Sequence, residues 1–419
     1  MISNSLLLVF VFLAGFDTLL PVVPPTMEAL TIEDLLVGGR ISVKELVLLV
    51  HVVLNVGQLL QMIKRPEPAT FVQSCYLFCV LGLASSMLNG QPDDAPQALR
   101  FLLAAYFAAS LATYVRKNGI GRPLVFLSLG MIASGTINLY HTFTSPRGLL
   151  GSLPMLWGQN GPGGYAGFFV GMAFPLALLA EGAWTKRILK LTVMACVFIV
   201  LISYSKLGMM MAALGLLAWS WQWLVAQRRG RVLRFSVALL ASLLAAWFTP
   251  AAVTEQLAVI YQYKFEDAFD ESDETRAYYY VAAAEVALTY PLGASFTGTG
   301  AAFDQTWAGR TGRLPVSDDV LAVNPHNSFL AFLAADGWLG LVPALLMFLF
   351  WVRSIRRALL AAGRLSPAVS SLLIGSCVIF SNTLPGFFEV FFIHALVLLM
   401  YLGQRLPRPA GCRVAPSRP

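Results

Sequence analysis

A histidine and an asparagine stand side by side at His326 and Asn327, where a polar segment meets an apolar one. Nine residues separate this pair from Gly337, and two more separate Gly337 from Gly340. Imidazole changes its charge near neutral pH and is the side chain that most often accepts a proton in catalysis. A polar pair at this boundary can contact a water-soluble group and a membrane-held group together, so it is the first candidate for chemistry. The alternative is a helix-capping motif with Asn327 as the N-cap.

Two cations occupy positions where a positive charge is costly. Arg276 opens a helix that we predict over residues 276–288, and the macrodipole disfavours a cation in the first turn of a helix. Lys206 lies in a tight polar turn between two apolar segments, at a depth where charged groups tend to be functional. Both cations suit phosphate oxygens. The structural alternatives are that Arg276 pairs with Asp273 or Glu274, and that Lys206 extends along the helix end to the membrane surface.

Two further pairs of polar residues are weaker candidates for a functional site. Arg147 and Asn160 lie in the polar segment 141–163 and could support a site there. His51 and His394 lie within apolar segments, where a histidine is more simply a satisfied core residue.

The elements that must position these residues are transmembrane helices. Apolar residues make up 57% of the chain and charged residues 12%, and the mean hydropathy is +0.70. Such values predict an all-α integral membrane protein, because a run of about 20 apolar residues crosses the hydrocarbon core as a helix. We predict about twelve spans, at 5–24, 46–63, 70–88, 101–115, 123–140, 164–182, 188–204, 207–226, 235–253, 328–352, 366–384 and 387–404.

The basic residues predict how the spans are oriented. With both termini cytoplasmic, the inner segments hold 20 of the 29 Lys and Arg residues. Short inner loops rich in positive charge follow the positive-inside rule. The net charge of +7 is therefore mainly a topological signal, and because these charges are spread over several short segments they do not predict a nucleic-acid-binding face.

One outer loop is much longer than the others. With this loop counted as a part of its own, the chain has four parts. Spans one to nine occupy 1–253, the large outer loop 254–325, spans ten to twelve 326–404, and a basic cytoplasmic tail 405–419. The loop holds 11 of the 22 acidic residues, and its predicted helix is amphipathic and ends at a Pro-Leu-Gly turn. A long loop with its own structure is typical of a functional element.

Cysteine usage predicts neither disulfides nor a metal centre. Four of the five cysteines, Cys75, Cys79, Cys196 and Cys377, lie in apolar segments and none lies in an outer loop. No zinc-ligand spacing occurs, so these residues are predicted to be small core residues. We predict no cofactor and no metal.

These features resemble the Wzy-type polysaccharide polymerases and the WaaL-type O-antigen ligases, over about residues 140–400. The ligase-type pattern is matched: a His, then Asn, Ser or Gln, then nine residues, Gly, two residues, and Gly, Thr or Tyr. A loop arginine that opens a helix ending in a Pro-Leu-Gly turn is matched as well. Lys206 stands where the family usually has Arg, which keeps the charge but loses the bidentate fork. The matching residues are His326, Asn327, Gly337, Gly340, Arg276, Pro291, Leu292 and Gly293, with Gly158 to Pro162 as an entry motif.

The resemblance implies a GT-C-like glycosyltransferase of the bacterial inner membrane that uses glycans linked to undecaprenyl diphosphate at the periplasmic face. Lys206 and Arg276 would bind the diphosphate, and His326 and Arg276 would be catalytic. Asn327, Gly337, Gly340, Arg147 and Asn160 would support them. A diphosphate leaving group needs cations rather than a protonating acid, which Lys206 and Arg276 would supply. Transfer would be metal-independent, because no acidic pair or Asp-x-Asp motif in the outer loops argues for a metal, and inverting, because it would be a single direct displacement.

Three functions remain open at this stage. A polymerase would join lipid-linked repeat units in O-antigen or exopolysaccharide synthesis, with a flippase and a chain-length regulator as partners. A ligase would transfer the finished polymer to lipid A-core. A transporter or flippase is the third, but such proteins usually show internal repeats and charged residues near the bilayer midplane, which this sequence does not show.

Overall fold

The fold is known from a computed structural model of the chain. The structure describes residues 2–18, 43–64, 69–92, 95–144, 182–203, 268–295, 298–314 and 328–362, with the short stretches 166–167, 169–170, 209 and 212–213.

Within these residues every regular element is a helix, which confirms the all-helical prediction for this part of the chain. The helices are α1 (Ile2–Thr18), α2 (Val43–Leu54), α3 (Val56–Lys64), α4 (Ala69–Leu88), α5 (Ala95–Asn118), α6 (Gly121–Thr144), α9 (Ala183–Ser203), α13 (Ala268–Thr289), α14 (Gly298–Asp304), α15 (Trp307–Arg310) and α16 (Ser328–Ala362).

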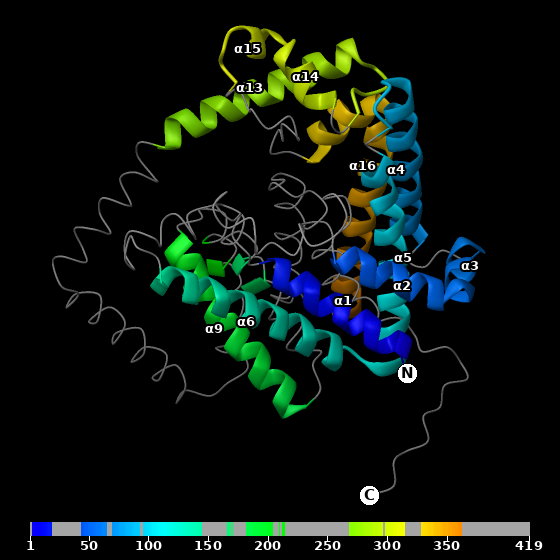
Figure 1. The fold of residues 1–419 in the computed structure, drawn as a ribbon, viewed down its shortest axis with the longest axis vertical. Helices are drawn as coiled ribbons and strands as arrows, with labels where there is room; N and C mark the ends of the chain where they lie inside the picture. Colours follow the sequence, from blue (N-terminus) through cyan, green and yellow to red (C-terminus); the bar gives the residue numbers. More distant parts are fainter. Residues whose placement is uncertain are drawn as a thin grey trace, which may run out of the picture.

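The helices pack in two groups beneath a cap. Helix α4 packs between α5 and α16, while α1 packs along α6, which also contacts α9 (Figure 1). Helices α13, α14 and α15 form the cap at the end where α4 finishes and α16 begins (Figure 1). The ring of Phe78 on α4 stacks on Phe332 of α16 and on Phe101 of α5, with centroids 3.9 and 4.9 Å apart. Aromatic stacking of this kind joins the three helices into one core.

Three of the described helices are long and apolar enough to cross a membrane: Thr70–Leu88, Ala98–Asn118 and Phe329–Phe350. They coincide with the predicted spans 70–88, 101–115 and 328–352. The total of twelve spans stays a prediction, because those at 207–226, 235–253, 366–384 and 387–404 lie almost wholly outside the described residues.

The span predicted at 46–63 is interrupted, and only its two helices taken together are long and apolar enough to count as a fourth span. Helices α2 and α3 meet at Asn55 and are bent by 87°. The 12 residues of α2 rise only about 18 Å, too short for a hydrocarbon core of about 30 Å. Helix α3 carries Gln58, Gln61 and Lys64 among its apolar residues, an amphipathic pattern typical of a helix in the membrane interface.

The core roles predicted for two residue types are confirmed where the structure describes them. His51 is buried, and its Nδ1 and Nε2 lie 2.8 Å from Tyr106 Oη and 3.2 Å from Ser3 Oγ. Cys75, Cys79 and Cys196 are buried free thiols. His394 and Cys377 lie outside the described residues.

Candidate functional site

The structure describes three of the eight predicted site residues. Gly337 and Gly340 lie in α16, and Arg276 lies in α13, where its backbone is described. The remaining five, His326, Asn327, Lys206, Arg147 and Asn160, lie outside the described residues.

Helix α16 is broken at Gly337. The backbone of this residue has φ 69° and ψ −162°, which L-amino acids with a side chain rarely adopt. A Cβ added here would lie 2.2 Å from the carbonyl oxygen of Pro291 and 2.6 Å from the nitrogen of Gly293. Only glycine therefore allows the Pro291–Gly293 turn of the outer loop to enter the break.

Gly293 meets the same constraint from the other side. Its φ is 91°, and a Cβ on it would lie 2.1 Å from the carbonyl oxygen of Ala335. The two glycines, Gly293 and Gly337, therefore interlock, each permitting the backbone of the other segment to approach.

Backbone hydrogen bonds are exchanged across this contact. Because α16 is interrupted, Trp338 does not continue the helical ladder and instead donates its N–H to the oxygen of Pro291, at 3.1 Å. The carbonyl oxygens of Ala334 and Ala335, which the break releases, accept the N–H groups of Ala294 and Ser295 at 2.9 and 3.0 Å. Buried backbone groups must be paired, so the loop turn and the broken helix satisfy each other.

Two polar residues at the end of α4 complete the contact. Ser85 is buried; its Oγ donates to Ala335 O at 2.8 Å and accepts the N–H of Ser295 at 3.1 Å. Asn89 donates its Nδ2 to Gly293 O at 2.9 Å. We call Ser85, Asn89, Pro291–Ser295 and Ala334–Trp338 the junction. The sequence analysis missed Ser85 and Asn89, because small polar residues at the end of an apolar span look like an ordinary helix end.

Gly340 lies one turn after the break. A Cβ on it would lie 2.7 Å from both the carbonyl oxygen of Phe332 and the Cβ of Asp336. Asp336 is itself buried, immediately before Gly337. The spacing of the two glycines thus lets α16 resume close against its own first segment.

The helix of the outer loop starts earlier than predicted. Helix α13 begins at Ala268, so Arg276 lies in its third turn and the prediction that Arg276 occupies the first turn is wrong. Asp270 and Glu271 occupy the first turn instead, where negative charge is favourable. The macrodipole argument for a ligand at Arg276 therefore no longer holds, and the case for this residue rests on its position.

That position is fixed by packing between α13 and the first segment of α16. Buried residues of α13, including Ala283 and Val286, share an apolar cluster with Ala334 and Leu330 of α16. Helix α13 contacts α16 near the junction, and followed backward along the chain α13 extends beyond the short first segment of α16 (Figure 1). Arg276 precedes Ala283 by seven residues, about two turns, along α13.

The cap has its own internal cross-links. Arg313 lies over the rings of Tyr278 and Trp307, 5.0 and 4.8 Å from the centroids, and Arg310 pairs with Glu285 at 3.8 Å. Glu285 Oε2 also accepts the N–H of Trp307 at 2.9 Å. Arg310 of α15 and Arg313 just after it thus both contact side chains of α13. Burial raises the pKa of the Tyr279 phenol, which stays protonated at neutral pH.

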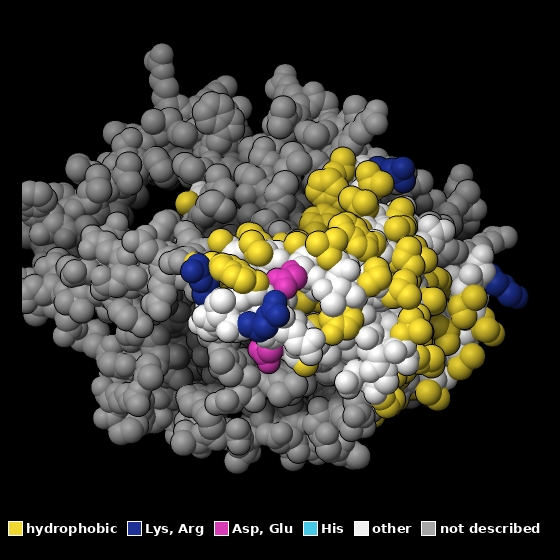
Figure 2. All heavy atoms as spheres, turned by 90° about the horizontal axis from the view of Figure 1, so that it is seen from above, with side chains coloured by type: hydrophobic (Ala, Val, Ile, Leu, Met, Phe, Trp, Pro, Cys, Tyr) yellow, Lys and Arg dark blue, Asp and Glu magenta, His cyan; other side chains and the backbone are white. Residues whose placement is uncertain are grey.

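Seen from the cap end, the described surface is mostly apolar with a few charged side chains (Figure 2). Leu288, Leu292, Trp338 and Leu339 are each about half exposed or more. Exposed tryptophan among aliphatic side chains is typical of a membrane–water boundary. Among the described residues, no group of three or more His, Cys, Asp or Glu could hold a metal ion, and metal-independence stays a prediction.

Removing the hydroxyl of Ser85 is expected to loosen the junction. Ser85→Ala leaves the buried N–H of Ser295 with one partner fewer and should destabilise the protein by about 1–3 kcal/mol. Ser86→Ala is the matched control, because Ser86 is equally buried but bonds only locally, to Gln91 O. Thermal unfolding in detergent measures the difference, and equal effects of the two substitutions would contradict the assigned role.

A side chain at Gly337 is expected to undo the junction altogether. Gly337→Ala combines a left-handed φ with overlap against the Pro291 oxygen, and about 2–5 kcal/mol of destabilisation follows. Gly57→Ala is the control, since nothing lies within 4 Å of its Cβ position. Protease sensitivity of the outer loop, followed with thermal unfolding, should rise only in Gly337→Ala; an unchanged loop would show that it does not dock at Gly337.

A family model matches part of the chain. Residues 191–345 match the family model described as O-antigen ligase. The matched residues include Lys206, Arg276, His326, Asn327 and the junction from Pro291 onward, whereas Arg147 and Asn160 precede them. No curated protein matches the chain.

Proposed function

We propose that this protein, in which the O-antigen ligase match confirms the resemblance to the Wzy/WaaL-type superfamily, is a polysaccharide polymerase. The match supports the O-antigen polymerase or ligase class of membrane proteins. In our proposal it joins oligosaccharide repeat units carried on undecaprenyl diphosphate, at the periplasmic face of the bacterial inner membrane. O-antigen or exopolysaccharide is the product.

The junction is the observation that carries this proposal. It fixes α13 beside the first segment of α16, and these two elements lead to Arg276 and His326. Arg276 is one turn before Tyr279 in α13, and His326 precedes Leu330 by four residues in the sequence; Tyr279 and Leu330 belong to the same apolar cluster. Since His326 is only two residues before Ser328, where α16 begins, its backbone lies within about 7 Å of that helix start. This packing supports a site that Arg276 and His326 share.

The chemistry follows from the leaving group. The acceptor hydroxyl attacks the anomeric carbon of the donor sugar, its new C–O bond forms as the bond to the diphosphate oxygen breaks, and the proton passes to His326. Undecaprenyl diphosphate leaves with both electrons of the broken bond, and Arg276 and Lys206 stabilise its charge. A single displacement inverts the anomeric carbon, with no metal taking part. Asn327, Arg147 and Asn160 support the site.

The ligase reaction is the second candidate, because the matching family model is described as O-antigen ligase and the histidine pattern is of that type. Both reactions require the same binding of the lipid-linked donor and differ only in the acceptor. Lysine at position 206, where the family usually has arginine, favours the polymerase in our proposal.

Acceptor choice tests the proposal. Purified protein would be given one lipid-linked repeat-unit donor, with either a second lipid-linked repeat unit or lipid A-core as the acceptor. We expect polymer of increasing length from the first pair and no product from the second. Product formed only with lipid A-core would make the protein a ligase.

The proposed topology puts the loop 254–325 in the periplasm and the tail after Arg405 in the cytoplasm. Flippase and chain-length regulator proteins would then be its partners on the same pathway. In a cysteine-free background, an impermeant thiol reagent applied to intact spheroplasts should label a cysteine at position 272 and not one at position 417. Labelling of both positions would contradict the topology.

A further inference from the structure

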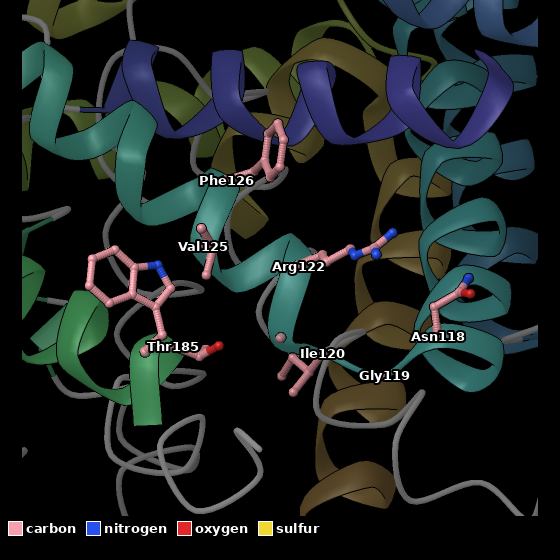
Figure 3. Close-up of a pocket in the computed structure, with 9 residues that line it drawn as sticks. Asn118, Gly119, Ile120, Arg122, Val125, Phe126 and Thr185 are labelled. Atoms are coloured by element: carbon pink, nitrogen blue, oxygen red, sulfur yellow. The ribbon is translucent and has the colours of Figure 1, made fainter. Parts of the chain in front are cut away.

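A cavity of about 410 Å³ lies at the end of the helices opposite the cap, between the α5–α6 turn and the start of α9 (Figure 3). The residues that line it include polar Asn118, Arg122 and Thr185 and apolar Val125, Phe126 and Trp184. The Arg122 side chain extends toward the side of Asn118, whereas Thr185 lies beside Trp184 (Figure 3). The volume lies in the range of small-molecule sites. Neither the glycosyl transfer nor the junction uses this cavity.

The charge around the cavity is strongly positive. Lys117, Lys186, Arg187 and Lys190 are exposed on the same helix ends as Arg122. No acidic residue occurs in 114–130 or in 182–203, although Glu181 directly precedes the second segment. By the positive-inside rule this end faces the cytoplasm, where the leaflet carries anionic lipids.

Helices α6 and α9 add to the positive potential because both begin at the cavity. The Cβ position of Gly121 faces Thr185 Oγ1 at 3.6 Å, and that of Gly135 faces Ile199 Cδ1 at 3.9 Å, so the two helices run parallel. Parallel neighbours place their positive N-terminal ends together.

An apolar surface leads away from the cavity. Trp184 is 69% exposed, and Leu191 and Met194 of α9, with Leu129 of α6, continue its exposed face along the helices. A soluble anion would use only the cationic pocket. A lipid would use both parts, with its phosphate at Arg122 and its acyl chains along Leu191 and Met194.

We propose that this cavity binds the phosphate headgroup of an anionic phospholipid of the cytoplasmic leaflet. Arg122 contacts the phosphate oxygens on the side of Asn118, Trp184 packs at the glycerol level of the membrane interface, and the lipid bridges α5, α6 and α9.

The test uses the full-length protein in neutral detergent and native mass spectrometry. Phosphatidylglycerol and phosphatidylcholine with the same acyl chains are titrated separately. The wild type should prefer phosphatidylglycerol by about fivefold or more, the effect of one well-placed cation. Arg122→Gln should remove this preference. Arg353→Gln, which removes an exposed cation of α16 outside the cavity lining, should keep it.

Two further measurements test the contribution of Trp184 and whether a free anion occupies the cavity in place of a lipid. Trp184→Ala truncates an exposed side chain and should weaken phosphatidylglycerol binding without loss of cooperative unfolding, so the proposal does not depend on the folding of Arg122→Gln alone. Inorganic phosphate at millimolar concentration should not displace the lipid. Equal binding of both lipids by the wild type, equal losses in Arg122→Gln and Arg353→Gln, or full displacement by phosphate would each overturn the proposal.

Discussion

Replacing His326 with alanine is expected to lower turnover by about 10²–10⁴-fold, the usual contribution of general-base assistance. The acceptor hydroxyl would then lose its proton to water in the transition state. Binding of the lipid-linked donor should be nearly unchanged, because Arg276 and Lys206 hold the diphosphate. Single-turnover transfer at saturating donor, together with a separate donor-binding titration, measures the two effects independently.

The Asn327→Ala variant is compared with His326→Ala, because the two residues are adjacent in the sequence. If Asn327 caps α16, its loss costs about 1 kcal/mol of stability and little activity. The capping alternative for both residues gives the opposite pattern, in which each substitution lowers the protein yield and the surviving protein remains active. A His326→Ala protein with normal turnover would remove this residue from the mechanism.

Replacing Arg276 with alanine is expected to lower transfer by at least about 10²–10³-fold, the cost of losing one preorganised donor to a developing negative charge. The amount of membrane-inserted protein should not change, because the buried face of α13 is formed mainly by Ala282, Ala283 and Val286. Arg276→Lys should recover part of the activity, since a point charge cannot reproduce the bidentate fork. Transfer assays on equal amounts of purified protein provide the measurement.

Arg310→Ala is the matched control for Arg276. It removes the same charge from the same outer loop, but Arg310 is 68% exposed and pairs with Glu285. An exposed ion pair contributes little, so near-normal transfer is expected. Equal losses in the two variants would mean that transfer depends on the total charge of the loop, and full activity of Arg276→Ala would leave Arg276 as a partner of Asp273 or Glu274. Lys206→Arg should be tolerated.

The straight transmembrane helices were predictable because length and composition suffice for them. Helix α4 covers the predicted span 70–88 almost residue for residue. The bend between α2 and α3 was not predictable from the sequence. The predicted span 46–63 has a suitable overall hydropathy, and the interruption depends on a few polar residues near Asn55. The start of α13 was missed because the acidic residues before Arg276 were assigned to a loop, although Asp and Glu favour the first turn of a helix.

The junction was predictable only in part. The pattern that includes Gly337, Gly340 and the Pro291–Gly293 turn pointed to the right residues, but no local signal showed that the turn enters a break in α16. Ser85 reaches Ala335 across 250 residues, and long-range pairing of this kind follows from packing and not from composition. The roles of Lys206, Arg147 and Asn160 stay predictions.

The most direct test of the proposed function is glycan transfer by the purified wild-type protein, with a lipid-linked repeat unit as both donor and acceptor. EDTA would be present, and released undecaprenyl diphosphate would be measured along with the glycan product. We predict one undecaprenyl diphosphate for each new glycosidic bond, inverted stereochemistry, and no effect of EDTA. A protein that consumes no lipid-linked donor, or one that EDTA silences and a divalent metal restores, would contradict the mechanism.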